Sequence, residues 1–162
     1  MHIKEETNAL VIELDDETET VALGRALAGL VRPGVVIGLS GPLGAGKTRL
    51  TRAIAEALGV DPEAISSPTF VLIHEYEGRL PVYHFDAYRL GGPKPFEALG
   101  ATDYWDAGGV CLVEWAELVA EVLPADAWRL ILTPTGPTAR RVELTGIPSA
   151  ALRQALGSAP GV

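Results

Sequence analysis

The sequence contains a single cysteine, Cys111, so a disulfide within the chain and a cysteine-rich zinc site are both excluded. Cys111 lies in the apolar run GVCLVEW, where we expect a buried thiol with a structural role. Long hydrophobic runs are also missing, because none approaches the roughly 18 residues of a membrane span. The first residues, MHIKEETNALVIEL, lack the basic start and the long apolar core of a signal peptide. These absences predict a cytoplasmic protein without a membrane segment.

Positive charge is scarce. Lys and Arg together number 13 against 21 Asp and Glu, which gives a formal net charge of −8. A protein that holds nucleic acid by itself usually shows a basic patch, and no such cluster is visible in the sequence. We therefore expect any contact with RNA to be made by a partner. The 162 residues, 48% of them hydrophobic, are sufficient for a single globular domain spanning 1–162.

Predicted strands and helices alternate along the chain, which indicates an α/β three-layer fold with a largely parallel sheet. The apolar runs that are typical of strands cover residues 9–14, 35–40, 70–76, 80–86, 109–115, 128–133 and 140–145. The third and fourth runs form one predicted hairpin and the last two form another, so antiparallel strands are added at the edges. Predicted helices follow the acidic residues DDETET, follow the glycines at 41–46, and cover 116–124 and 148–156. Asp16 or Thr18 is expected to cap the first helix, and GGPKP at 91–95 is expected to break the chain.

The stretch GPLGAGKT at 41–48 matches the phosphate-binding loop G-x-x-x-x-G-K-[ST]. It follows a predicted strand and opens a predicted helix, which is the context that this motif requires. Glycines let successive backbone N–H groups point at phosphate oxygens, and the helix dipole adds positive potential there. Lys47 is expected to reach the β- and γ-phosphates and the Thr48 hydroxyl to bind Mg²⁺, while Pro42 has no N–H to donate. The predicted binding set is Gly41, Leu43, Gly44, Ala45, Gly46, Lys47 and Thr48.

Two carboxylates, Asp86 and Glu114, each follow an apolar strand. Acids at the carboxyl ends of strands lie on the ligand side of an open α/β sheet. A P-loop site needs such an acid to help hold Mg²⁺ and to align the attacking water or acceptor. The structural alternative for either acid is a solvated strand end or an ion-pair partner.

Four other residues carry two interpretations each. Thr69, in SSPTF, is either part of a nucleotide-sensing switch or part of an ordinary turn. For His84, on a mostly apolar strand, a hydrogen-bonded core position is favoured over catalysis. Trp115 belongs to the core or covers the site, and Arg89 meets a phosphate or pairs with an acid.

Several stretches together resemble the TsaE family, also called YjeE. They are GPLGAGKT, SPTF, HEY, VYHFDAYRL, the segment EALG-x-x-DYW, and LVEW followed by LP, over residues 35 to 124. They occur in the order and with the spacing of that family. The P-loop alone is weak evidence for one family, but SPTF, HFDxYRL and hhhEW together are specific. The chain departs from the usual family pattern at Pro42 and Ala87, and it matches poorly after residue 124.

The resemblance implies a bacterial P-loop ATPase that uses ATP and Mg²⁺ and is required for making threonylcarbamoyladenosine at position 37 of tRNAs that read codons starting with A. It implies a partner, the TsaB–TsaD complex, in which TsaD transfers the threonylcarbamoyl group. ATP hydrolysis would reset that complex, and tRNA would be reached only through the partners. The resemblance further implies a protein that is a weak ATPase alone, and we expect it to be monomeric.

Carried over to this sequence, the resemblance gives roles to individual residues. Lys47 contacts the phosphates, Thr48 and Glu114 hold Mg²⁺, Asp86 positions water, and Thr69 acts as the switch threonine. Trp115 matches the tryptophan beside the glutamate. The nearest matches to the adenine contacts are Glu17 or Thr18 and Arg140 or Arg141.

Two other functions stay open from the residues. A small-molecule kinase also begins with a P-loop, and Asp86 with Arg89 could hold its acceptor hydroxyl. Such kinases usually close an arginine-rich lid over the nucleotide, and the segment GGPKPFEALG carries no arginine. The second open function is a non-hydrolytic switch, in which the bound ATP only controls docking. Asp86 and Glu114 favour hydrolysis over it without deciding the matter.

Overall fold

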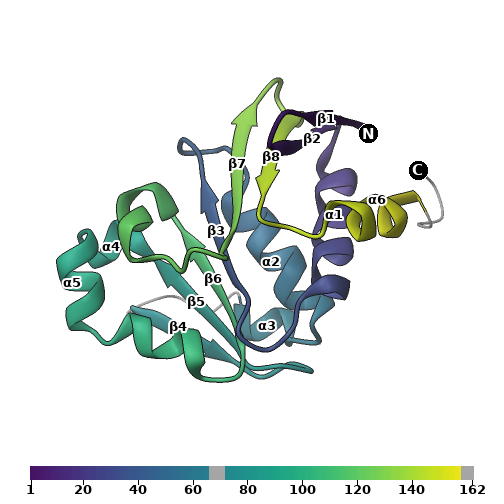
Figure 1. The fold of residues 1–162 in the computed structure, drawn as a ribbon. Helices are drawn as coiled ribbons and strands as arrows, with labels where there is room; N and C mark the ends of the chain where they lie inside the picture. The colour runs from purple at the N-terminus through teal and green to yellow at the C-terminus, as the bar shows by residue number, and fades with distance from the viewer. Residues whose placement is uncertain (66–71, 158–162) are drawn as a thin grey trace.

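The computed structural model describes residues 1–65 and 72–157, which contain one eight-stranded sheet (Figure 1). The order of the strands is β1-β2-β8-β7-β3-β6-β5-β4. The central strands β7, β3, β6 and β5 pair in parallel, and the outer strands pair antiparallel. The strand bounds are β1 His2–Glu6, β2 Ala9–Leu14, β3 Val36–Ser40, β4 Ile73–Tyr76, β5 Val82–Asp86, β6 Val110–Glu114, β7 Trp128–Pro134 and β8 Arg140–Thr145. The predicted parallel centre, both predicted hairpins and the antiparallel edges are therefore confirmed, but the β7–β8 hairpin is not itself at an edge, because β2 and β1 extend the sheet beyond it.

Helices cover both faces of the sheet and complete the predicted three layers. Figure 1 shows α1, α2 and α6 on one side and α4 and α5 on the other. Within the described ranges no helix is long and apolar enough to cross a bilayer. The bounds are α1 Glu17–Leu30, α2 Lys47–Ala57, α3 Pro62–Ile65, α4 Ala87–Leu90, α5 Pro93–Ala98 and α6 Ser149–Gly157, with 3₁₀ helices η1 Ala101–Asp106 and η2 Ala116–Val122.

The alternation of side chains along β6 divides the core into two clusters, one on each face. Val110 and Leu112 pack with α1 and α2, whereas Cys111 and Val113 pack on the opposite face. Burial raises the pKa of the Cys111 thiol to about 12, and the prediction of a buried cysteine is confirmed. The same alternation turns Glu114, the last residue of β6, toward the face that carries α2.

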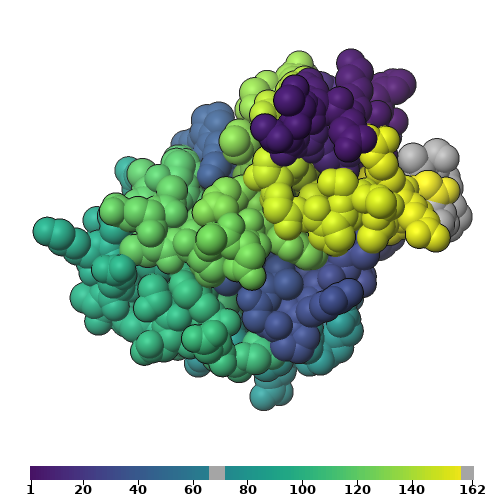
Figure 2. Space-filling model, in the orientation of Figure 1, coloured from purple at the N-terminus to yellow at the C-terminus, as the bar shows by residue number. Residues whose placement is uncertain are grey.

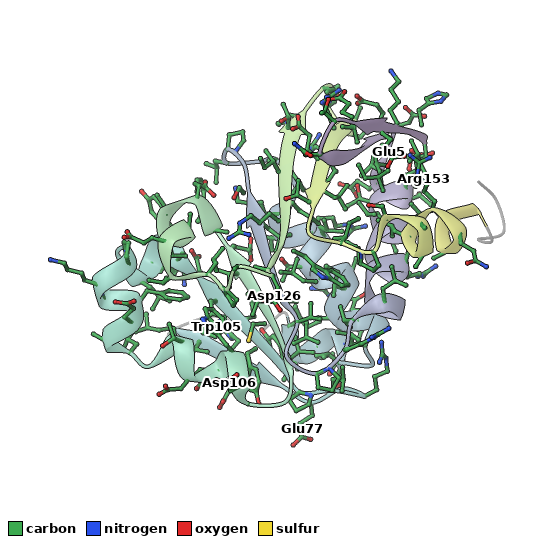
Figure 3. All side chains as sticks on the ribbon, viewed as in Figure 1. Glu5, Glu77, Trp105, Asp106, Asp126 and Arg153 are labelled. Atoms are coloured by element: carbon green, nitrogen blue, oxygen red, sulfur yellow. The ribbon has the colours of Figure 1, made fainter. Side chains whose placement is uncertain are left out.

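The first and last segments of the chain close one end of the sheet. β2 pairs with β8, so the N-terminal hairpin of β1 and β2 extends the sheet beyond the C-terminal strand. Figure 2 shows the N-terminal residues in purple directly against the C-terminal segment in yellow. Glu5 and Arg153 lie beside each other in Figure 3 and form an ion pair at 3.1 Å.

Three predictions of local structure were incomplete or wrong. β1 was not predicted, because HIKEE is mostly charged and exposed and becomes a strand only by pairing with β2. GGPKP does not simply break the chain: Gly91 ends α4 in a left-handed conformation, and Pro93 begins α5, where its fixed φ suits the first turn. The helix expected over 116–124 is η2, with irregular backbone at Val119. By contrast, Asp16 caps α1 as expected, accepting from Glu19 N at 2.9 Å.

Two glycines of α1 provide a matched test of helix packing. A Cβ atom at Gly24 would lie 2.6 Å from the Cβ of Ala53 in α2, whereas at Gly29 it would meet nothing within 4 Å. We expect Gly24→Ala to lower the free energy of unfolding by about 1–3 kcal/mol through overpacking. Gly29→Ala should raise it by about 0.5–1 kcal/mol because alanine favours a helix. Urea unfolding measures both, and equal effects of the two substitutions would contradict this packing.

Candidate functional site

The predicted phosphate-binding loop lies between β3 and α2, at the carboxyl edge of the parallel strands. Gly41, Gly44 and Gly46 have φ of 142°, 79° and 99°, a backbone conformation that side chains disfavour. A Cβ atom at Gly41 would also collide with the carbonyl of Leu132 in β7. The loop borders a cavity of about 220 Å³, lined by Leu43, Gly44, Ala45, Gly46, Lys47, Thr48, Arg49, Glu114 and Trp115. The structure thus brings the predicted loop residues and Glu114 together.

The ammonium group of Lys47 lies against the backbone of this loop. Its Nζ donates to the carbonyls of Gly41 and Pro42, the second at 3.0 Å, and lies 3.7 Å from the centroid of the Trp115 ring. Burial lowers the pKa of Lys47, although nearby carboxylates, Glu114 among them, oppose the shift. A cation held by neutral partners is well suited to exchange them for an anion.

Glu114 is the buried acid of the site, with 7% of its surface exposed. Thr48 Oγ1 donates to Glu114 Oε1 at 2.6 Å, and His84 Nε2 lies 2.5 Å from Glu114 Oε2. Burial alone would raise the pKa of Glu114, but the hydrogen bonds from His84 and Thr48 and the charge of Lys47 outweigh it, and the pKa is lowered. The carboxylate therefore stays ionised beside the Thr48 hydroxyl.

His84 belongs to this site, although the sequence favoured a core position for it. It is hydrogen-bonded, as expected, but its partner is the carboxylate of Glu114. Residues of even number in β5 face the same side as Val82, which packs with the α1 and α2 cluster. His84 thus shares a face with Asp86, and the spacing of two residues was the feature of the sequence that could have revealed this.

Asp86 ends β5 directly opposite Glu114 in the parallel register. Its carboxylate caps α4, accepting from Tyr88 N at 3.1 Å and from Arg89 N at 3.4 Å. Arg89 Nε lies 3.6 Å from Asp86 Oδ2, so the acid pairing expected as one interpretation of Arg89 is present. Asp86 lies at the edge where the site is built, and its role with water or metal stays a prediction.

Trp115 takes an unusual backbone conformation beside Glu114. Its φ of 58° is the one positive value at a non-glycine residue in the described ranges, and such strain is typical of functional positions. The ring lines the loop cavity, contacts Lys47 and lies 5.3 Å from the ring of Tyr88. Of the two interpretations of Trp115, the covering of the site is the one that its position favours.

The remaining predicted residues are placed as follows. Thr69 lies outside the described residues. Glu17 is mostly exposed and pairs with Arg49, which lines the loop cavity, at 3.5 Å. Arg141 points to carboxylates of β1, β2 and β8, whereas Arg140 donates to the loop carbonyls of Gly44 and Ala45 at 3.0 and 2.8 Å. Adenine contacts by Glu17 or Arg140 stay predictions.

The donors present fit a magnesium ion better than a metal that needs an all-protein cage. Across residues 1–65 and 72–157, no group of three or more His, Cys, Asp and Glu side chains is arranged to hold a metal. Mg²⁺ is usually bound through one or two carboxylates together with substrate phosphates. The carboxylate of Glu114 and the hydroxyl of Thr48, beside a phosphate-binding loop, match that requirement.

Comparison with known proteins gives consistent matches. The family described as "Threonylcarbamoyl adenosine biosynthesis protein TsaE" matches residues 14–142. A relative from Bacillus subtilis, named tRNA threonylcarbamoyladenosine biosynthesis protein TsaE, is 42% identical over 130 residues, or 80% of each chain. A relative of the same name from Streptomyces coelicolor is 47% identical over 133 residues, 77% of this chain and 88% of its own. The crystal structure of YdiB from Bacillus subtilis superimposes with a TM-score of 0.72 at 34% identity and covers 97% of both chains.

The hydrogen bonds to Glu114 can be tested through its pKa. We expect His84→Ala to raise the pKa of Glu114, because burial, which raises it, would lose its main opposing contact. Thr48→Val should raise it less, because the Thr48 contact opposes burial more weakly than His84 does. Carboxyl ¹³C NMR titration of the two variants measures both effects. A Glu114 pKa that is unchanged or lower in His84→Ala would contradict this account.

Proposed function

The chain belongs to the TsaE family, and on that premise we propose that it is a Mg²⁺-dependent ATPase that supports threonylcarbamoylation of adenosine 37 in tRNAs reading codons that start with A. Its relatives carry the name of tRNA threonylcarbamoyladenosine biosynthesis proteins. In this proposal ATP hydrolysis resets the TsaB–TsaD complex between rounds of transfer. The chain itself makes no modification of the tRNA.

The contact between Thr48 and Glu114 carries this proposal. A threonine hydroxyl at the start of the P-loop helix lies 2.6 Å from an ionised, buried carboxylate at the end of a neighbouring parallel strand. A P-loop that only anchors a phosphate has no need for an acid so close to its binding groups, since the negative charges of the carboxylate and the phosphate repel each other. Such an acid is expected where a divalent cation must be shared between protein and nucleotide.

The residues of the site divide the work as follows. Loop N–H groups and the N-terminus of α2 bind the phosphates, and the Lys47 ammonium exchanges its carbonyl partners for phosphate oxygens. Glu114 and Thr48 would hold Mg²⁺, which when bound offsets the charge that develops on the transferring phosphate. His84 orients Glu114 through Oε2. Asp86, opposite Glu114 in the register, is proposed to position the attacking water.

The charge of the chain supports an indirect role with tRNA. Its formal net charge of −8 disfavours binding to a phosphate backbone, so the TsaB–TsaD complex is proposed to hold the RNA. An acidic protein is also suited to a basic surface on a partner. We propose that the chain alone is a monomer with weak ATPase activity and that the partner complex raises this activity.

Phosphate release from ATP, measured with and without the bacterial TsaB–TsaD pair, tests the proposal. We expect the pair to raise release by the wild type, and Lys47→Ala to abolish the rise because the phosphates lose their cation. Lys4→Ala, a change of an exposed lysine on β1, is the matched control and should leave the rise intact. Release that ignores the pair but requires a small metabolite would overturn the proposal in favour of a kinase.

Glu114→Gln separates hydrolysis from docking. The amide keeps the shape of the side chain and removes its charge, so ATP should still bind. Turnover with the pair should fall by a factor of about 10²–10³, the usual effect of lost transition-state electrostatics. Isothermal titration calorimetry gives the binding and phosphate release gives the turnover. Unchanged turnover would mean that Glu114 has no hydrolytic role.

A further inference from the structure

We propose that Arg140 is a positioning residue that fixes the shape of the phosphate-binding loop from outside, by holding the backbone carbonyls of Gly44 and Ala45. Arg140 Nε donates to Ala45 O at 2.8 Å and Nη2 donates to Gly44 O at 3.0 Å. Nη1 donates to Gly136 O at 3.1 Å and to Ala139 O at 2.8 Å. All three guanidinium nitrogens are thus used, two on the loop and one on the turn between β7 and β8.

The topology of the sheet brings Arg140 to this position. β7 runs parallel to β3, so the carboxyl end of β7 lies beside the loop that follows β3. The chain then turns and returns as β8, whose first residue is Arg140, paired with Pro134. The loop also touches β7 directly, because a side chain at Gly41 would collide with the carbonyl of Leu132. The hairpin therefore forms the outer wall of the phosphate-binding loop.

The planarity of the peptide bond explains how a contact with carbonyls acts on the phosphate side. In a trans peptide the C=O of one residue and the N–H of the next point in opposite directions. Arg140 holds the Ala45 carbonyl outward and so turns the Gly46 N–H away from the hairpin. A charge-assisted hydrogen bond also polarises the peptide and strengthens its N–H as a donor. A lysine would keep the charge without the planar fork that reaches both carbonyls.

The partners of Arg140 leave its positive charge available to the loop. Arg141, its neighbour in β8, pairs with Glu6, Glu13 and Glu143. In the described part of the chain no carboxylate forms an ion pair with Arg140, and its hydrogen bonds go to neutral carbonyls. Its charge therefore adds to the positive potential where the phosphate is expected.

The inference rests on the proposed nucleotide-binding role, and it differs from the predicted contact between Arg140 and adenine in what it requires of the ligand. A contact with the base matters only for a ligand that has a base. A residue that shapes the loop matters equally for ATP and for inorganic tripolyphosphate, which presents the phosphates alone. The two ligands therefore distinguish the two roles of one side chain.

Isothermal titration calorimetry of Arg140→Lys with ATP and with tripolyphosphate, each with Mg²⁺, makes the comparison. We expect both ligands to bind about ten- to a hundredfold more weakly than to the wild type, because a lysine cannot make both charge-assisted hydrogen bonds to the loop. Arg129→Lys is the matched control. Arg129 also donates to a backbone carbonyl, that of Pro124, but it lies near the start of β7, at the end of the hairpin away from the loop. Arg129→Lys should therefore leave the affinities for ATP and for tripolyphosphate unchanged.

Amide hydrogen exchange without ligand provides a second measurement. The Ala45 N–H donates to Pro42 O at 3.0 Å inside the loop. We expect this amide to exchange at least about tenfold faster in Arg140→Lys, because a looser loop opens more often, and to exchange at the wild-type rate in Arg129→Lys. Global unfolding followed by circular dichroism shows whether Arg140→Lys is folded under these conditions.

Each outcome decides the proposal. Weaker binding of ATP with unchanged binding of tripolyphosphate would overturn it and assign Arg140 to the base. Binding of both ligands by Arg140→Lys with wild-type affinity would also overturn it, and would indicate that Arg140 contributes only its charge. If the wild type binds neither ligand, the proposed nucleotide function fails, and the exchange rate of the Ala45 amide then decides: an unchanged rate overturns the positioning role.

Discussion

The buried charge of Glu114 is the constraint on which the candidate site depends. A carboxylate that is taken out of water stays ionised only if hydrogen bonds and a cation compensate for the lost hydration. Thr48 and His84 supply the hydrogen bonds, and Lys47 supplies the charge. These residues come from α2 and β5, so the acid at the end of β6 links three elements at a single point. Misplacing any of them would weaken this compensation and raise the pKa of Glu114.

The parallel centre of the sheet makes this arrangement possible. Because β3, β6 and β5 run in the same direction, the loop after β3 and the acids that end β6 and β5 meet at one edge. The alternation of side chains then selects the face. Val110 and Leu112 of β6 face the helix α2, so Glu114 faces its N-terminus, where the Thr48 hydroxyl lies. The apolar core on that face and the polar site at its edge thus follow from one pattern along the strand.

The sequence predicts the parts of this protein that a local pattern marks, two hairpins among them, and misses side-chain contacts between segments that are far apart in the chain. The phosphate loop is contiguous, and both acids follow apolar runs, so each could be found from its neighbours. The contact of His84 with Glu114 spans 30 residues, and that of Arg140 with Ala45 spans 95. Both depend on the register between strands, which no local pattern fixes here. β1 was missed for another reason: its residues are mostly charged and exposed, and they form a strand only beside β2.

The loop is held on two sides, and this bears on the phosphate binding that is proposed for it. Lys47 already donates to Gly41 and Pro42, the Ala45 N–H already donates to Pro42, and Arg140 already holds the outer carbonyls. In the proposed binding a phosphate would displace the inner contacts, so its affinity would reflect the difference between two sets of hydrogen bonds. The outer contacts would not need to change, and in the positioning role proposed for Arg140 they would reduce the entropy that ordering the loop otherwise costs. On this proposal a phosphate would enter a loop whose shape is set before the ligand arrives.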